Sequence, residues 1–310
     1  LTAGTSPLEI ACTYGNFPAV RFLLENKLYL PTNVPEAVTA AASSRYLDIL
    51  KLLLKVLYPH DSPQARELKT KNASLLHVLA SWCHDFRFIE QEIIGSYEYN
   101  VHGIYEDKTP LFQALQNGNA VVVPLLLQEK YLPREEHTMY LLHAAAMGGS
   151  LKLTKLLMEQ IPLVIDQRNS FYHTKQFGYV TPLHLAVMSR SLPLVKYFVN
   201  ALKIKPDSKS DINLTPLHLA ACKNLVFSRS QSEIVEYLIL ASGHPCLLTK
   251  VHTFPEVVGT GLTPHDVAAT KEIRLLLEKY SPNLVAERLL VPSDAIQIEY
   301  VYLSVCVREF

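Results

Sequence analysis

Four histidines stand at the same place in a recurring short phrase of the sequence, and imidazole is a common metal ligand and general base. In each copy the phrase begins three residues before the histidine. Packed helical layers lie about 10 Å apart, whereas zinc ligands lie about 2 Å from a shared ion, so histidines of neighbouring copies cannot share a metal. We therefore expect a structural role for His77, His143, His184 and His218.

A second group of metal-ligand residue types comprises His244, Cys246 and His252. Their spacing matches no established zinc pattern, and Cys246 equally suits an apolar gap. Motifs of hydrolytic or phosphate-binding sites are absent from the sequence, among them G-x-S-x-G, H-E-x-x-H and G-x-x-x-x-G-K-[ST]. The sequence therefore predicts a protein that is not an enzyme, with no catalytic residue, no metal and no cofactor.

The clearest copies of the phrase are Thr181-Pro182-Leu183-His184-Leu185-Ala186 and Thr215-Pro216-Leu217-His218-Leu219-Ala220. Thr215 suits a helix N-cap, and Pro216 suits the first helical position, where its missing N–H costs nothing. A phrase recurring at a period near 33 residues is typical of stacked helix pairs. On these residues the sequence resembles the ankyrin-repeat family, whose signature is T-P-L-H-x-A.

The resemblance implies an all-α solenoid over residues 1–280, built of about eight helix-turn-helix repeats that β-turn or hairpin loops join. The chain has 310 residues, of which 49% are hydrophobic, enough for a continuous core. The match is strong in repeats one, four, five, six and seven and weaker in two, three and eight. The repeats begin near residues 6, 36, 74, 109, 140, 181, 215 and 263.

Three repeats depart from the regular pattern. Pro124 falls inside the expected second helix of the fourth repeat, so that helix should begin late or kink. The second helix of the third repeat, Phe86 to Ile94, is irregular, and the eighth repeat is short and charged, as suits a terminal repeat with one face in water. Residues that tolerate a positive φ are expected in the turns before the repeats: Gly4, Asn72, Asp107, Asn213 and Gly261.

The resemblance also assigns a role to the signature residues. In the ankyrin family the histidine forms hydrogen bonds to its own turn and to the adjacent repeat. The resemblance implies the same role for the four histidines of this chain. Thr181, Thr215 and Thr263 belong to the same structural signature. Phe112 and Glu9 replace the histidine in the fourth and first repeats, so the bond is missing or replaced there.

Partners of ankyrin arrays usually meet the loop tips and the exposed side of each first helix. By register, that surface holds the only Trp of the chain and few charges. Aromatic and Met residues are enriched in interface cores, which favours a protein or peptide partner over nucleic acid. The alternative is that Trp82 and the Met residues pack inside the array. The predicted partner-binding residues are Tyr14, Trp82, Lys108, Gln116, Asn117, Met147, Tyr179, Val180, Met188 and Lys223.

Two insertions, residues 165–180 and 224–232, form a second candidate surface. The first contains the aromatic residues Phe171, Tyr172 and Phe177 besides Tyr179. Long loops in compact arrays are often functional. The other interpretation is a hairpin finger whose rings pack on the next finger, and the sequence favours neither.

Residues 281–310 depart from the repeat pattern and form a linker followed by a β-like segment at 295–307, rich in β-branched and aromatic residues. We expect this segment to be the first strand of a truncated following domain, and the alternative is that it docks on the array. Since Leu1 is not an initiator Met, we expect the chain to be a fragment of a larger protein.

The balance of charge argues against nucleic acid and anionic membrane as partners, because Lys+Arg and Asp+Glu number 29 each. Five scattered cysteines without C-x-x-C spacing predict reduced thiols and a cytoplasmic protein, with the nucleus as the alternative. No apolar run approaches a membrane span.

The resemblance implies a monomeric, non-catalytic scaffold or adaptor for a protein or peptide partner. The alternative is a cytosolic regulatory ankyrin domain of a larger signalling protein, enzyme or cation channel.

Overall fold

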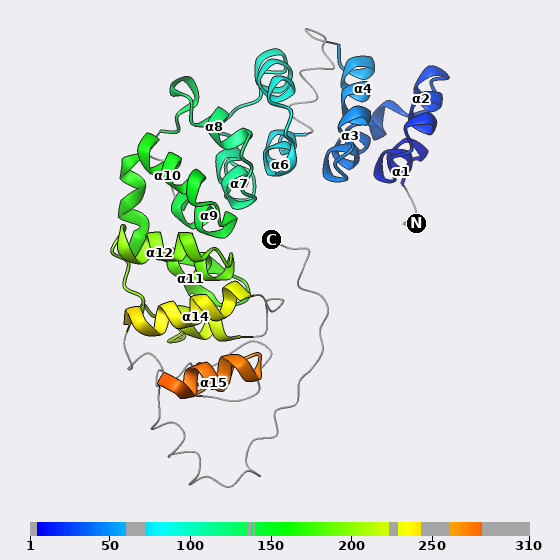
Figure 1. Cartoon of the computed structure of the whole chain (residues 1–310). Coiled ribbons are helices and arrows are strands. Elements are labelled where there is room, and N and C mark those ends of the chain that lie inside the picture. Colours follow the sequence, from blue (N-terminus) through cyan, green and yellow to red (C-terminus); the bar gives the residue numbers. More distant parts are fainter. Residues whose placement is uncertain are drawn as a thin grey trace. The chain divides into compact units, whose positions relative to one another are not determined.

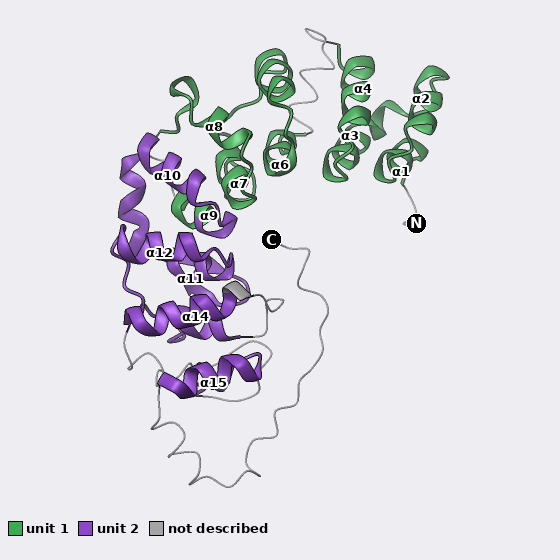
Figure 2. Ribbon diagram, viewed as in Figure 1, with its two compact units in different colours: residues 1–145 green, residues 146–310 purple. Residues whose placement is uncertain are grey.

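The computed structural model describes residues 5–59, 72–134, 138, 140–222, 229–242 and 261–280, and these residues are mostly helical (Figure 1). The chain divides into two compact units, residues 1–145 and 146–310, which we describe separately (Figure 2). The β-like segment at 295–307 and the group of His244, Cys246 and His252 lie outside the described residues.

Compact unit 1 is a succession of short helices joined by tight turns. It contains α1 (Pro7–Thr13), α2 (Phe17–Glu25), the 3₁₀ turn η1 (Pro31–Asn33), α3 (Val34–Ser43), α4 (Leu47–Leu57), α6 (Leu75–Trp82), the π-helix η2 (Phe88–Ser96), α7 (Pro110–Gln116), α8 (Val122–Leu126) and the 3₁₀ turn η3 (Glu129–Tyr131). Helix α9 (Leu141–Gly148) crosses the boundary between the units.

Compact unit 2 adds one small sheet to the same design. It contains α10 (Leu151–Gln160), the 3₁₀ segment η5 (Pro162–Asn169), the antiparallel strands β1 (Tyr172–Thr174) and β2 (Gly178–Val180), α11 (Pro182–Met188), α12 (Leu192–Asn200), α13 (Pro216–Ala221), α14 (Arg229–Ser242) and α15 (Lys271–Tyr280).

Caps and turns fix where these helices begin. Ser6 Oγ accepts from the Glu9 N–H at 3.1 Å, and Thr109 Oγ1 accepts from the Phe112 N–H at 3.2 Å. Each cap satisfies a first-turn N–H that has no partner within the helix. Gly149, with φ 69°, makes the tight turn between α9 and α10. The starts of α1 and α7 are therefore set within a few residues of sequence.

Small residues allow neighbouring first helices to approach closely. In compact unit 1, α1 packs on α3, α3 on α6, and α6 on α7. Ala37, Ala41, Ala80 and Ala114 at these contacts are fully buried. Each helix thus buries its apolar side against its sequence neighbours, as expected for stacked repeats.

A repeated contact joins successive second helices in compact unit 2. Lys155 of α10 lies over the Tyr197 ring of α12, with 5.6 Å from Nζ to the ring centroid. Lys196 of α12 lies over the Tyr237 ring of α14 at 5.7 Å, and the Tyr237 hydroxyl donates to Asn200 Oδ1 at 3.0 Å. Such cation–π contacts contribute about 0.5–1 kcal/mol each.

Two second helices are irregular, as the sequence predicts. Helix α8 begins only at Val122, so Pro124 falls in its first turn, where a missing N–H is tolerated. The expected helix Phe86 to Ile94 becomes the π-helix η2, whose wider turn is rare and concentrated at functional sites.

The prediction of a complete helix-turn-helix in the eighth repeat is wrong, because its first helix is missing. Residues 264–267 form turns instead. Ala268 makes a β-bridge with Cys222, and the Ala269 N–H donates to the Ala221 carbonyl at 2.8 Å. Backbone groups of Ala268 and Ala269 that a helix would use for its own hydrogen bonds are therefore paired with residues 221 and 222.

The expected positive φ is found at Asp107, Asn213 and Gly261 but is wrong for Asn72, while Gly4 lies outside the described residues. Asn72 is buried, and its side-chain N–H group donates to the Pro35 carbonyl at 2.9 Å. It therefore joins two repeats instead of making a left-handed turn.

Candidate functional site

His184 and His218 belong to the scaffold. His184 Nδ1 accepts from the Thr181 N–H at 3.3 Å and lies 2.8 Å from Thr181 Oγ1, so the ring proton is on Nε2, which donates to the Leu214 carbonyl at 3.0 Å. His218 repeats the pattern with Thr215 and the Leu262 carbonyl. These bonds to the local turn and to the next repeat are the ones that the ankyrin resemblance implies.

Burial keeps His184 neutral. The side chain is fully buried, and desolvation lowers its pKa to about 4, helped by the nearby His218. His77 has a lowered pKa for the same reason, and its Nε2 lies 2.9 Å from the Gly103 carbonyl and 3.1 Å from the Lys108 carbonyl.

The remaining signature residues are also buried. His143 is fully buried, and its ring forms a T-shaped pair with the Tyr140 ring, with centroids 5.6 Å apart. Thr263 is 7% exposed. Within the described residues, no three His, Cys, Asp or Glu side chains gather closely enough to hold a metal ion. Cys12, Cys83 and Cys222 are buried cysteines in the thiol form.

The predicted partner-binding residues differ widely in exposure. Tyr14 is 75% exposed, Tyr179 is 50% exposed and Asn117 is exposed. Lys223 lies outside the described residues. The half-buried members are Trp82, Lys108, Gln116, Met147 and Met188.

Val180 was wrongly predicted as a contact residue, because it is fully buried. Successive side chains of a strand point to opposite faces, so in β2 Tyr179 points outward and Val180 points into the core. The sequence pattern alone did not show which of the two faces outward.

Trp82 ends α6 with its ring half-buried, and its indole N–H is buried without a hydrogen-bond partner among the described residues. An indole N–H in such a place normally has a partner. Because part of the ring is exposed and part is buried, Trp82 is compatible both with contact to a partner and with packing inside the array.

The hairpin β1–β2 is the finger that the sequence suggested in residues 165–180. His173 pairs with Tyr179 across the strands, and their rings meet edge to face with centroids 5.0 Å apart. The Tyr179 N–H donates to Asp211 Oδ1 of the next turn at 3.1 Å. Phe177 is buried and Phe171 is 45% exposed, so both interpretations apply, each to different rings.

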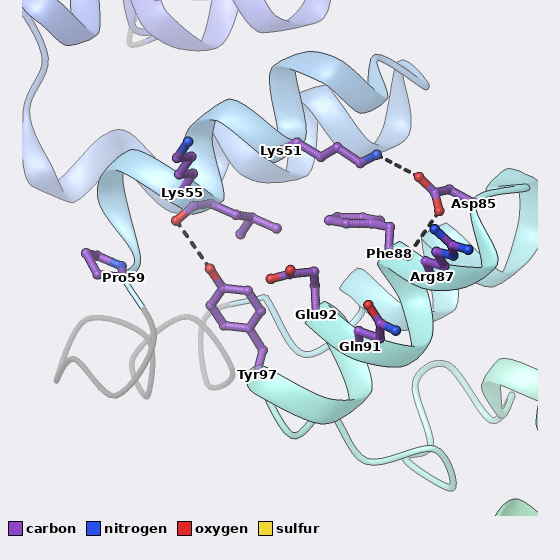
Figure 3. Close-up of a pocket in the computed structure, with 10 residues that line it drawn as sticks. Lys51, Lys55, Pro59, Asp85, Arg87, Phe88, Gln91, Glu92 and Tyr97 are labelled. Carbon is purple, nitrogen blue, oxygen red and sulfur yellow. Dashed lines mark hydrogen bonds and ion pairs between the residues drawn. The ribbon is translucent and has the colours of Figure 1, made fainter.

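A groove between α4 and η2 in compact unit 1 was not anticipated (Figure 3). Its volume is about 660 Å³, within the range of ligand pockets. The described residues that line it are Lys51, Leu54, Lys55, Pro59, Asp85, Arg87, Phe88, Gln91, Glu92 and Tyr97.

Polar contacts fix the shape of this groove. Lys51 Nζ lies 2.6 Å from Asp85 Oδ2 and 5.2 Å from the centre of the Phe88 ring. The Phe88 N–H donates to Asp85 Oδ1 at 3.0 Å, and Lys51 lowers the pKa of Asp85. The Tyr97 hydroxyl donates to the Tyr58 carbonyl at 2.7 Å, which ties the end of η2 to the end of α4.

The irregular sequence of residues 86–94 was the one feature of the sequence that pointed to this region. It predicted a distorted helix, and the distorted helix is η2, which carries Phe88, Gln91 and Glu92 on its groove side (Figure 3). The opposite wall, α4, is 34 residues away in sequence at the Lys51–Asp85 contact, so sequence spacing could not reveal the pairing.

The comparisons with known proteins identify the class. A family model described as ankyrin repeats, in three copies, matches residues 142–250. Residues 142–250 therefore have the sequence of ankyrin repeats, and the all-α class expected from the sequence is confirmed. No curated protein matches the sequence.

Among solved structures, the chain is similar to the ankyrin repeat domain of Bcl-3, described as a unique member of the IkappaB protein family. The two are 19% identical with a TM-score of 0.38, and the match covers 89% of this chain and 99% of that one. No described helix is both long enough and apolar enough to cross a membrane.

Proposed function

We propose that this protein is a non-catalytic scaffold or adaptor that binds a protein or peptide partner through its loop fingers and the exposed sides of its first helices. Ankyrin repeats are generally protein–protein interaction modules, and residues 142–250 match them. The partner itself is a matter for experiment.

The observation that carries the proposal is the aromatic tip of the β1–β2 hairpin. Tyr179 is half exposed, yet its backbone is held by Asp211 and its ring by His173. A rigid exposed aromatic side chain loses little conformational entropy on binding, which is why such residues are frequent in hot spots. Tyr14 on α1 offers a second exposed aromatic, in compact unit 1.

The test is quantitative affinity capture with the whole chain and the Tyr179→Ala variant, followed by titration of each captured protein. Loss of a hot-spot tyrosine should weaken binding at least about thirtyfold, which corresponds to about 2 kcal/mol. Phe22→Ala is the matched control, since Phe22 is 58% exposed on the second helix α2.

Partners retained by wild type and Phe22→Ala but lost by Tyr179→Ala would support the proposal. Equal retention by all three chains would remove the hairpin tip as the binding surface. Thermal unfolding of each variant shows that lost binding does not come from lost structure.

A further inference from the structure

The groove between α4 and η2 has two positive ends. Lys55 projects from α4 and Arg87 from the residues just before η2, and Figure 3 shows them at opposite ends of the groove. Both side chains are exposed, and neither forms an ion pair among the described residues. Lys51, by contrast, is neutralised by Asp85 at 2.6 Å.

Part of the wall between these ends is apolar. The Phe88 ring lies on the η2 side and Leu54 on the α4 side, while Pro59 contributes at the rim. The Tyr97 hydroxyl has one proton, which it donates to the Tyr58 carbonyl at 2.7 Å, and the Leu54 carbonyl lies 3.2 Å from the same oxygen. This hydroxyl therefore has no proton left to donate to a ligand. An apolar side chain is the natural occupant of such a wall.

The carboxylates of the groove restrict what can bind between its ends. Asp85 and Glu92 line it, so a continuous polyanion such as nucleic acid would meet negative charge along its path. The formal net charge of the chain is zero, which supplies no attraction at long range. Isolated negative charges separated by an apolar group fit the lining better.

We propose that this groove docks a short segment of a protein partner in which two acidic side chains flank an apolar one. The acidic groups pair with Lys55 and Arg87, and the apolar side chain packs between Leu54 and Phe88. Acidic-motif recognition by basic side chains is an established mode of peptide binding. The inference rests on the proposed protein-binding function but adds a second surface, on the second-helix side of compact unit 1.

The experiment uses the whole chain and a short fluorescein-labelled peptide in which Glu alternates with Leu, with binding followed by fluorescence anisotropy. Two comparison peptides replace every Glu by Lys or every Leu by Ser. The test variant is Lys55→Glu with Arg87→Glu. The control is Lys205→Glu with Lys209→Glu, because these exposed lysines of compact unit 2 give the same change in net charge.

The Glu/Leu peptide should bind to wild type and to the control. Binding to the Lys55→Glu, Arg87→Glu variant should be at least about tenfold weaker, since two exposed charge pairs become repulsive. The Glu/Ser peptide should also bind more weakly than the Glu/Leu peptide, because it lacks the apolar contact.

Equal binding of the Lys and Glu peptides, or equal weakening in both double variants, would overturn the proposal. Binding of phosphatidylserine vesicles or single-stranded DNA at Lys55 and Arg87 in preference to the Glu/Leu peptide would also overturn it. The Tyr179→Ala variant should bind the peptide as wild type does. If the peptide fails to bind while the hairpin-tip partners remain, only the groove assignment fails and the proposed function stands.

Discussion

At the scale of single residues, the signature histidines hold repeats together because they stay neutral. His184 uses both ring nitrogens, one toward Thr181 and one toward the Leu214 carbonyl, and burial removes any water that would stabilise a charge. A second proton would need the nitrogen that already accepts from Thr181. Protonation therefore opposes folding at this position.

We predict that stability falls as the pH is lowered from 6.5 toward 4. The folded pKa of His184, about 4, lies below the unfolded value of 6.5, so in this window the unfolded chain binds a proton that the folded chain does not. The free energy of unfolding should drop by about 3 kcal/mol across the window from this residue alone. Denaturant unfolding at several pH values measures it.

The control for this prediction is His173→Gln, because His173 is exposed. His184→Gln should flatten the pH dependence, whereas His173→Gln should leave it unchanged. Parallel pH curves for wild type and His184→Gln would show that other groups carry the effect.

At the scale of elements, buried amide side chains join one helix pair to the next. Asn119 is 2% exposed, and its side-chain N–H group donates to the carbonyls of Ala80 and Cys83 at the end of α6, at 3.1 and 2.9 Å. Its Oδ1 accepts from the N–H groups of Val121 and Val122, where α8 begins. One side chain thus caps two helices from different repeats.

Asn119→Ala should lower the free energy of unfolding by about 3 kcal/mol, because it leaves several buried backbone groups without partners. Asn117→Ala is the matched control in the same turn. Asn117 is exposed, its one bond returns to the Gln113 carbonyl of its own helix, and its loss should cost no more than about 0.5 kcal/mol. Equal midpoints for both variants in denaturant unfolding would contradict the role of Asn119.

At the scale of the whole molecule, stability in a stacked array is close to a sum of repeat terms and neighbour contacts. The repeats therefore need not open together. In η2 the backbone bonds are of the wider π type, such as Tyr97 N–H to the Glu92 carbonyl at 2.8 Å. In α12, regular turns and the contact of Lys196 with Tyr237 support the helix.

We predict that amide hydrogen exchange is faster in η2 than in α12. Both elements have nine residues, so the comparison is matched in length. Mass-spectrometric exchange under native conditions should show Phe88–Ser96 opening first, since π-turns are less favourable than α-turns. Slower exchange in η2 than in α12 would show that the groove contacts of Lys51, Asp85 and Tyr97 outweigh the helix type.

The sequence by itself determined the features that depend on a few neighbouring residues. The cap at Thr215, the late start of α8 around Pro124 and the irregularity of 86–94 all follow from local backbone chemistry. The register of the histidines also predicted a structural role for them, because side chains in layers about 10 Å apart cannot share one metal ion.

Only the tertiary structure decided features that join distant parts of the chain. An isolated β-bridge between Ala268 and Cys222 replaces a helix. Val180 points inward while Tyr179 points outward, and the groove forms only where α4 meets η2. Each depends on a partner that lies many residues away or on which face of a strand is covered. Local sequence preferences act over a few residues and contain no information about that partner.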